Sequence, residues 1–247
     1  MGFRNIWKKE MRSLAPLYGV YCALVLLLHL ILLYKKVYLD TEIMMVGALF
    51  LPFLFVSAMA IGTGYYQLHT EWRTNSIYLL LSLPIRGWKV LTAKILAVYA
   101  LLLISSLWIA VSFGLILLRA SWQEVRVSEA MPPLFPSLFN LALNTFWMYS
   151  LATLFLLMLV QFTFLCGQLT AKFKWIVMIG AGFGALWLVL RISPLLSNLL
   201  LWMPELAYGG VDVEVIYLHP GPFVVLLLIS VGLLALNGYI FEKEVEV

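Results

Sequence analysis

The stretch from 90 to 118, VLTAKILAVYALLLISSLWIAVSFGLILL, has a single charged residue, Lys94, in its 29 positions. The hydrocarbon core of a bilayer is about 30 Å thick, and a helix needs roughly 20 apolar residues to cross it. The stretch is continuously apolar, whereas a strand of a membrane barrel alternates between apolar and polar residues. It therefore predicts a membrane-spanning helix.

Five further runs are long and apolar enough to be spans: 17–34, 44–66, 138–169, 175–193 and 222–241. Charged residues make up only 11% of the chain, against about 25% in soluble domains. The two cysteines, Cys22 and Cys166, fall inside these runs, and we expect them to be small buried residues. The sequence predicts an all-α polytopic membrane protein whose residues 17–247 form one domain with six transmembrane helices.

The basic residues are distributed unevenly between the two sides of such a bundle. If the N-terminus is cytoplasmic, eleven of the 16 Lys and Arg residues lie in inner segments. This positive-inside bias predicts a multi-pass protein of the cell membrane with both termini in the cytoplasm. Because these residues flank spans and form no continuous stripe, they do not indicate a nucleic-acid partner.

Two segments outside the spans have patterns of their own. Residues 1–16, MGFRNIWKKEMRSLAP, place apolar residues at helical spacing among four basic ones, which predicts an amphipathic helix against anionic lipid at the inner interface. Pro16 is expected to separate it from the first span. Residues at about 194–206, between Pro194 and the loop after Pro204, are apolar but too short to span. They predict a re-entrant or interfacial segment near the outer face.

The inner segment 67–89 between the second and third spans is the most informative for function. It contains HTEWRTNSIYLLLSLPIRGWK, in which 76–83 is a short apolar helix that Pro84 ends. The chain then turns back to the membrane at 86–89. A short helix in a cytoplasmic loop can dock a soluble partner while it stays tied to two spans. The segment therefore suggests a mechanical coupling device.

This order of residues resembles the permease family of ABC-2 type transporters. Its members have an acidic residue after the second span, a small-residue turn, a Leu-rich helix, a Leu-Pro step and a basic residue that opens the third span. The matching residues here are Glu71, Asn75-Ser76, Leu79-Leu80-Leu81, Leu83-Pro84 and Lys94, together with Trp7-Lys8-Lys9-Glu10 in the N-terminal helix. Asn75 stands where many members have Gly.

The resemblance implies an exporter subunit with partners. Such permeases pair with a second copy or a homologous permease, and two separate ATPase subunits bind their cytoplasmic loops. The chain has no G-x-x-x-x-G-K-[ST] motif, so ATP and Mg are expected on the partner ATPase and no cofactor on this chain. The residues that the resemblance assigns to ATPase docking are Glu71, Trp72, Arg73, Leu80, Leu83, Pro84 and Arg86.

Polar residues inside the spans could line a translocation path. The candidates are His29, Asn140, Asn144 and Gln161. Ionisable groups inside a membrane are costly and often functional. Hydrogen bonds between neighbouring helices explain the same residues without a path, and both interpretations remain open at this point.

Two other classes of function compete with transport. An intramembrane enzyme needs a catalytic pair or a metal cluster within the spans, but the chain lacks G-x-S-x-G and H-E-x-x-H. Its three histidines, His29, His69 and His219, are expected at different depths, so we expect neither a catalytic nor a metal site. A membrane-embedded scaffold or sensor without transport remains the alternative.

Overall fold

The computed structural model describes residues 2–35, 46–77, 86–127, 131–170, 172–210 and 213–244. Helices account for nearly all of them. In chain order the elements are α1 (Gly2–Lys35), η2 (Val46–Phe50), α3 (Leu51–Arg73), α5 (Gly87–Val127), α6 (Met131–Gln168), α7 (Lys174–Asn198), β1 (Leu206–Gly210), β2 (Val213–Leu218), α8 (Gly221–Tyr239) and η3 (Ile240–Glu244). The two η elements are short π-helices that continue into or out of an α-helix.

Six helices within these described ranges are long and apolar enough to cross a membrane. They cover Gly2–Tyr34, Val46–Arg73, Gly87–Leu115, Phe139–Gln168, Lys174–Asn198 and Gly221–Glu242. Each corresponds to one of the six predicted runs. The predicted all-α fold with six helices of membrane-spanning length is therefore confirmed.

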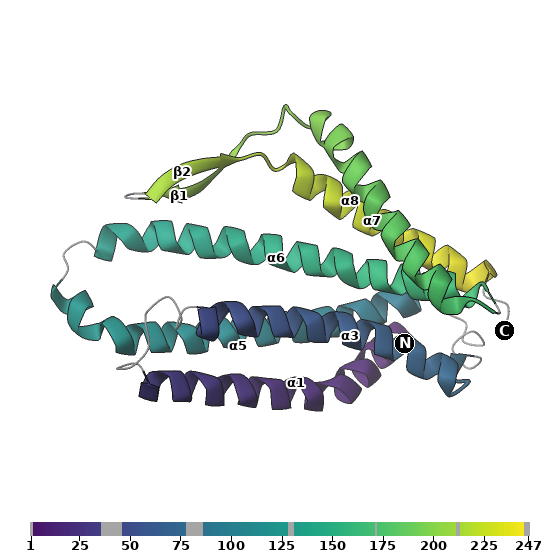
Figure 1. Cartoon of the computed structure of the whole chain (residues 1–247), viewed down its shortest axis with the longest axis horizontal. Coiled ribbons are helices and arrows are strands. Elements are labelled where there is room, and N and C mark those ends of the chain that lie inside the picture. The colour runs from purple at the N-terminus through teal and green to yellow at the C-terminus, as the bar shows by residue number, and fades with distance from the viewer. Residues whose placement is uncertain are drawn as a thin grey trace.

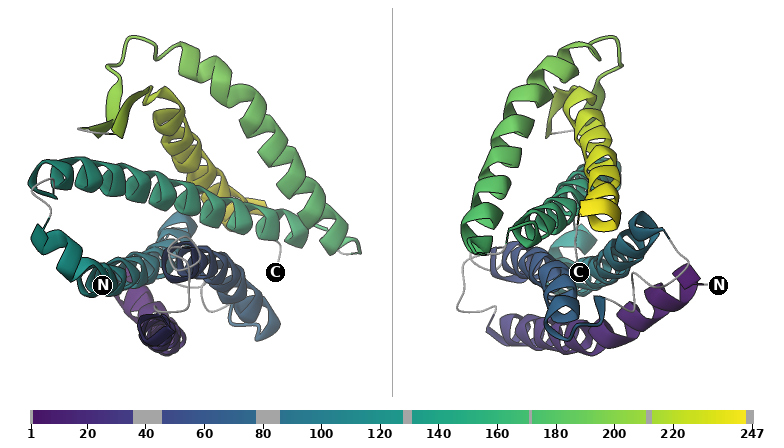
Figure 2. Two further views of the ribbon diagram at one scale, coloured as in Figure 1. Left: turned by 60° about the vertical axis from the view of Figure 1, so that its left-hand side comes forward. Right: turned by 90° about the vertical axis from the view of Figure 1, so that its right-hand side faces the viewer.

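The helices form two groups joined by α6. Figure 1 shows α1, α3 and α5 side by side, with α7 and α8 on the opposite side of α6, and Figure 2 shows the same division from two other directions. Both termini lie toward the right-hand end of Figure 1. The largest core cluster joins α1, α3, α5 and α6 and consists of Leu14, Tyr18, Val25, Val56, Ala60, Val98, Leu101, Leu102, Ile109 and Leu157.

Helix α7 lies at the edge of the molecule. It packs on α6 and α8, and Val189 is its one buried residue. The rest of the helix, including Phe183, Trp187 and Leu190, is largely exposed. An apolar helix with one packed face is stable where lipid covers the other face, because the acyl chains are as apolar as its side chains.

The N-terminal segment differs from the prediction in two ways. Residues 1–16 were expected to form a separate helix, but α1 continues through Pro16, and Figure 1 shows its first part at an angle to the rest. A proline inside a helix removes one hydrogen bond and bends the axis without ending the helix. Moreover, Ile6 packs on Val90 and Ala93 of α5, so α5, and not lipid alone, covers the apolar side of this segment.

The segment predicted to be re-entrant or interfacial forms parts of two different elements, and its place relative to a membrane stays a prediction. Residues at about 194–206 are the last turn of α7, a turn and the first residue of β1. An antiparallel β-hairpin follows, in which Leu206 pairs with Leu218 and Tyr208 with Ile216. The hairpin was not predicted, although residues 213–218, VEVIYL, are rich in the β-branched and aromatic residues that favour strands. Strand β1 packs against α6.

Candidate functional site

The C-terminal end of α3 opens the connection that the sequence singled out. The backbone N–H and the hydroxyl of Thr74 both donate to the carbonyl of Thr70, at 2.9 and 2.8 Å. Asn75 then has a φ of 55°, in the left-handed region that glycine adopts most easily and asparagine tolerates. Asparagine is therefore compatible with the backbone conformation of this turn.

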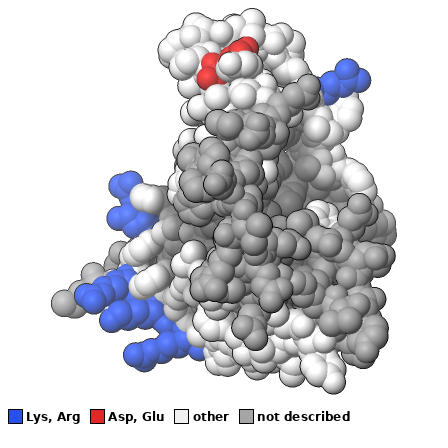
Figure 3. Space-filling model, turned by 90° about the vertical axis from the view of Figure 1, so that its left-hand side faces the viewer, with Lys and Arg blue, Asp and Glu red and all other residues white. Residues whose placement is uncertain are grey.

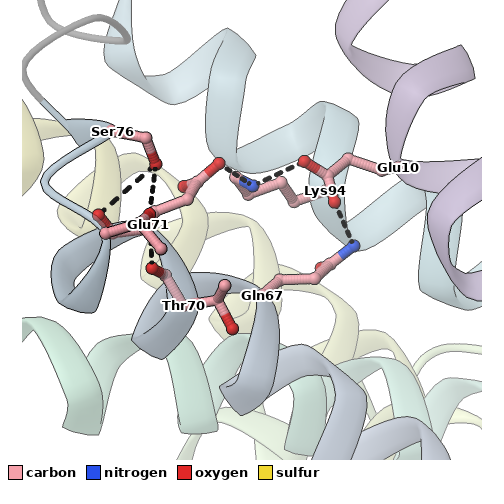
Figure 4. Close-up of polar contacts among 7 residues, drawn as sticks. Glu10, Gln67, Thr70, Glu71, Ser76 and Lys94 are labelled. Atoms are coloured by element: carbon pink, nitrogen blue, oxygen red, sulfur yellow. Dashed lines mark hydrogen bonds and ion pairs between the residues drawn. The ribbon is translucent and has the colours of Figure 1, made fainter.

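A buried ion-pair network lies beside this turn and joins three helices (Figure 4). The ammonium of Lys94 on α5 donates to Glu71 of α3 at 2.6 Å and to Glu10 of α1 at 2.8 Å. The amide of Gln67, one turn before Glu71, donates to the second oxygen of Glu10 at 3.0 Å. Lys94 is 1% exposed and both glutamates are 6% exposed, so neither water nor lipid reaches the charges.

Burial makes the members of this network dependent on one another. Removing an ion from water costs several kcal/mol, and an opposite charge in good geometry offsets that cost. Loss of one partner typically costs about 3–5 kcal/mol, because the other charge stays buried without compensation. The network therefore holds the N-terminal parts of α1 and α5 and the C-terminal end of α3 in one arrangement.

Next to the ion-pair network, an apolar cluster connects the end of α3 to α6 and to the C-terminal end of α8. The Trp72 ring meets Phe164 of α6 and Phe241 of η3 edge-on, with centroids 5.2 and 6.0 Å apart. Ile77, the last described residue before 86, is buried in the same cluster. Trp72 thus connects the end of α3 to two further helices.

The other end of the connection is attached to the C-terminal part of the chain. The backbone N–H of Gly87 donates to the carboxylate of Glu242 in η3. A Cβ at Gly87 would lie 2.6 Å from the ring of Phe241, and one at Gly238 would collide with Trp88. These glycines allow the start of α5 to lie directly against the end of α8.

The predicted docking residues divide between interior and surface. The carboxylate of Glu71 is buried in the ion-pair network, whereas Trp72 is half-buried and packs against aromatic rings. Both side chains anchor the end of α3, and their docking role stays a prediction. Arg73 and Arg86 are exposed. Leu80, Leu83 and Pro84 lie outside the described residues.

His29, predicted as a possible path residue, is bound between helices. Its Nε2 lies 2.7 Å from the carbonyl of Ala48 in η2, and its Nδ1 lies 2.8 Å from the hydroxyl of Ser112 on α5. A carbonyl can only accept, so Nε2 donates to Ala48, and Nδ1 forms its hydrogen bond with the Ser112 hydroxyl, which can act in either role. With 3% exposure and both ring nitrogens satisfied, His29 fits the helix-packing interpretation.

The other three path candidates share no common site with His29 in the contacts observed. Asn144 donates to Asn140 at 2.8 Å and accepts from the Trp147 indole at 3.0 Å, all on α6. Gln161 is 1% exposed, and its Oε1 has no hydrogen-bond partner among the described residues. The structure thus places the candidates in separate local environments.

Two members of the ion-pair network were missed by the sequence reasoning. Glu10 was quoted only within the Trp7-Lys8-Lys9-Glu10 motif, yet it lies one turn from both Ile6 and Leu14, which pack in the interior. A carboxylate on the packed face of a helix signals a buried partner. Gln67 precedes Glu71 by one turn, so it shares the same face of α3 and carried a similar signal.

Any assignment of this protein to a functional class depends on the contacts described above. The described residues contain no group of three or more His, Cys, Asp or Glu side chains placed to hold a metal ion. Several buried polar side chains instead bind neighbouring helices, among them His29 and the Glu10, Glu71 and Lys94 group. Comparisons with protein-family models, curated proteins and solved structures gave no match to this chain.

Proposed function

We propose that the chain is the transmembrane permease subunit of an ATP-driven exporter of the ABC-2 type. In this proposal it lies in the cell membrane with both termini in the cytoplasm. It pairs with a second copy or a homologous permease, and a separate ATPase subunit supplies ATP hydrolysis. The motifs of the 67–89 segment and the absence of a P-loop from the sequence support this assignment.

The attachment of the α3–α5 connection at both of its ends carries the proposal. At one end Glu71 binds Lys94, and at the other Gly87 binds Glu242. A partner that pulls on the residues between them therefore moves α1, α3, α5 and α8 together, since closely packed contacts transmit displacement and do not deform continuously. This is the mechanical property that a coupling segment needs.

The surface at this connection favours an acidic partner face. Arg73, Arg86 and Lys89 are exposed around the two ends of the connection, and α1 exposes four further basic residues, Arg4, Lys8, Lys9 and Arg12. Figure 3, which views the molecule from the end opposite the connection, shows Lys and Arg mainly on one flank and acidic side chains at the top. Complementary charge increases association rates and sets orientation more than it sets affinity.

The proposal is tested by purifying the tagged chain in detergent from its native membrane and identifying bound proteins by mass spectrometry. We expect a stoichiometric P-loop ATPase. The double variant Arg73→Glu, Arg86→Glu should lose that ATPase, whereas Arg191→Glu, at an exposed position on α7, should retain it. Recovery of the chain alone, where control transporters stay intact, contradicts the proposal and favours the scaffold or sensor.

A further inference from the structure

The ion-pair network of Glu10, Glu71 and Lys94 is unbalanced in charge. Two carboxylates share one ammonium, so the fully ionised group has a net charge of minus one. All three side chains are at least nine-tenths buried. A net charge in the interior is unfavourable unless a further ion or a proton neutralises it.

Two buried acceptor atoms without a hydrogen-bond partner show which part of the network carries the excess negative charge. Glu10 uses both oxygens, since Oε1 accepts from Lys94 and Oε2 accepts from Gln67. Glu71 accepts from Lys94 through Oε1 only. Its Oε2 is buried, as is Oε1 of Gln67, and neither has a hydrogen-bond partner among the described residues. The two unpaired acceptors belong to side chains one turn apart on the same face of α3.

The surrounding helices supply no second buried cation among the described residues. On α1 the remaining charged neighbour of Glu71 is Lys9, whose side chain is exposed, and on α3 itself Arg73 is exposed. Where α6 and η3 meet the end of α3, the packed side chains are apolar, and the η3 carboxylate of Glu242 is directed to the backbone of Gly87. The packed apolar residues are Phe164, Leu165, Ile240 and Phe241.

We propose that Glu71 is a proton-binding site, with the proton on Oε2. A proton there neutralises the buried carboxylate whose second oxygen has no hydrogen-bond partner among the described residues. It also leaves one carboxylate, Glu10, opposite one ammonium, Lys94, so the buried group becomes neutral. This inference concerns the chain alone and does not depend on the proposed ATPase or on transport.

The test is infrared spectroscopy of the full chain in lipid nanodiscs, titrated from acidic to alkaline pH in H2O and D2O. The readout is the C=O stretch of protonated carboxylic acids. At neutral pH we expect one buried protonated carboxyl in the wild type, lost on alkaline titration and absent from Glu71→Gln. Glu10→Gln should also remove it, because one carboxylate then balances Lys94.

Glu205→Gln is the matched control, because Glu205 is exposed and outside the network, so the neutral-pH band should persist in that variant. A wild type without the band at neutral pH overturns the proposal, as does a band that survives both Glu71→Gln and Glu10→Gln. If a network variant fails to fold, labelling of wild type with a hydrophobic carbodiimide decides, since such reagents modify protonated carboxyls. Glu71 should be modified at neutral pH and spared at alkaline pH, and no modification of Glu71 contradicts the proposal.

Discussion

Lys94 and Glu71 are 23 residues apart in the sequence and form a 2.6 Å ion pair inside the helix bundle. The residues between them include the whole α3–α5 connection. The Glu71–Lys94 pair therefore joins the end of α3 to the start of α5. Lys94 also binds Glu10, which extends the closure to the N-terminal helix. The arrangement predicts which substitutions loosen this end of the bundle.

Replacement of Lys94 should destabilise the protein more than replacement of any exposed basic residue. Lys94→Met leaves the buried carboxyl groups of Glu10 and Glu71 without a cation, and we expect a loss of about 3–5 kcal/mol in the free energy of unfolding. The measurement is thermal denaturation of the detergent-solubilised chain, followed by size-exclusion chromatography. Lys174→Met, on an exposed residue at the start of α7, is the control and should change stability by less than about 0.5 kcal/mol.

Removal of the whole network should be better tolerated than removal of its cation. In the variant Lys94→Met, Glu10→Gln, Glu71→Gln no buried charge remains, so much of the stability lost in Lys94→Met should return. The same denaturation assay compares the two variants. A triple variant that is less stable than Lys94→Met contradicts the view that uncompensated charge causes the loss.

The close contact between α5 and α8 predicts a difference between two glycines of one helix. A Cβ at Gly238 would overlap Trp88, whereas a Cβ at Gly232 would meet nothing within 4 Å. We expect Gly238→Ala to destabilise by about 1–3 kcal/mol through overpacking. Gly232→Ala should be neutral or stabilising by up to about 1 kcal/mol, because Ala favours a helix. Equal melting temperatures for the two variants contradict this packing.

His29 should prove to be a packing residue. His29→Phe removes two hydrogen bonds and leaves the Ala48 carbonyl without this partner, so we expect a loss of about 1–3 kcal/mol. His69→Phe is the control, since His69 is exposed and stacks on Tyr65. If ATP-dependent transport is reconstituted, His29→Phe should retain its substrate range once protein amounts are equalised. A changed range at unchanged stability supports a path role instead.

The sequence was sufficient to predict the spanning helices because each span has its own continuous signal. Residues 90–118 and the other five runs are recognisable from length and apolarity alone. The break at Pro16 was predicted wrongly because a proline bends a helix as readily as it ends one, and the packing of Ile6 on α5 decides between the two outcomes. That contact lies between residues more than eighty positions apart.

The candidate site was predictable in location but not in detail. Glu71 and Lys94 were noted from the sequence, yet only packing of three helices shows that they bind each other and Glu10. A single sequence does not give the rotation of a helix about its axis, so exposed Arg73 and buried Glu71 look equivalent there. The hairpin was missed because its strands are short and follow a turn-rich segment, where local signals are weak.

The turn at Asn75 offers the sharpest test of the connection's geometry. With φ at 55°, Asn75→Gly should be neutral or slightly stabilising, because Gly adopts this conformation without steric cost. Asn75→Ala should lose about 1 kcal/mol and Asn75→Val more, since a β-branched residue is least compatible with positive φ.

Limited proteolysis between 74 and 86 reports local opening, and thermal denaturation reports the whole fold. Because Asn75 is exposed, packing changes little across the series. The order Gly, Asn, Ala, Val in decreasing resistance to proteolysis therefore measures backbone strain, and a Val variant as resistant as Gly excludes the left-handed turn.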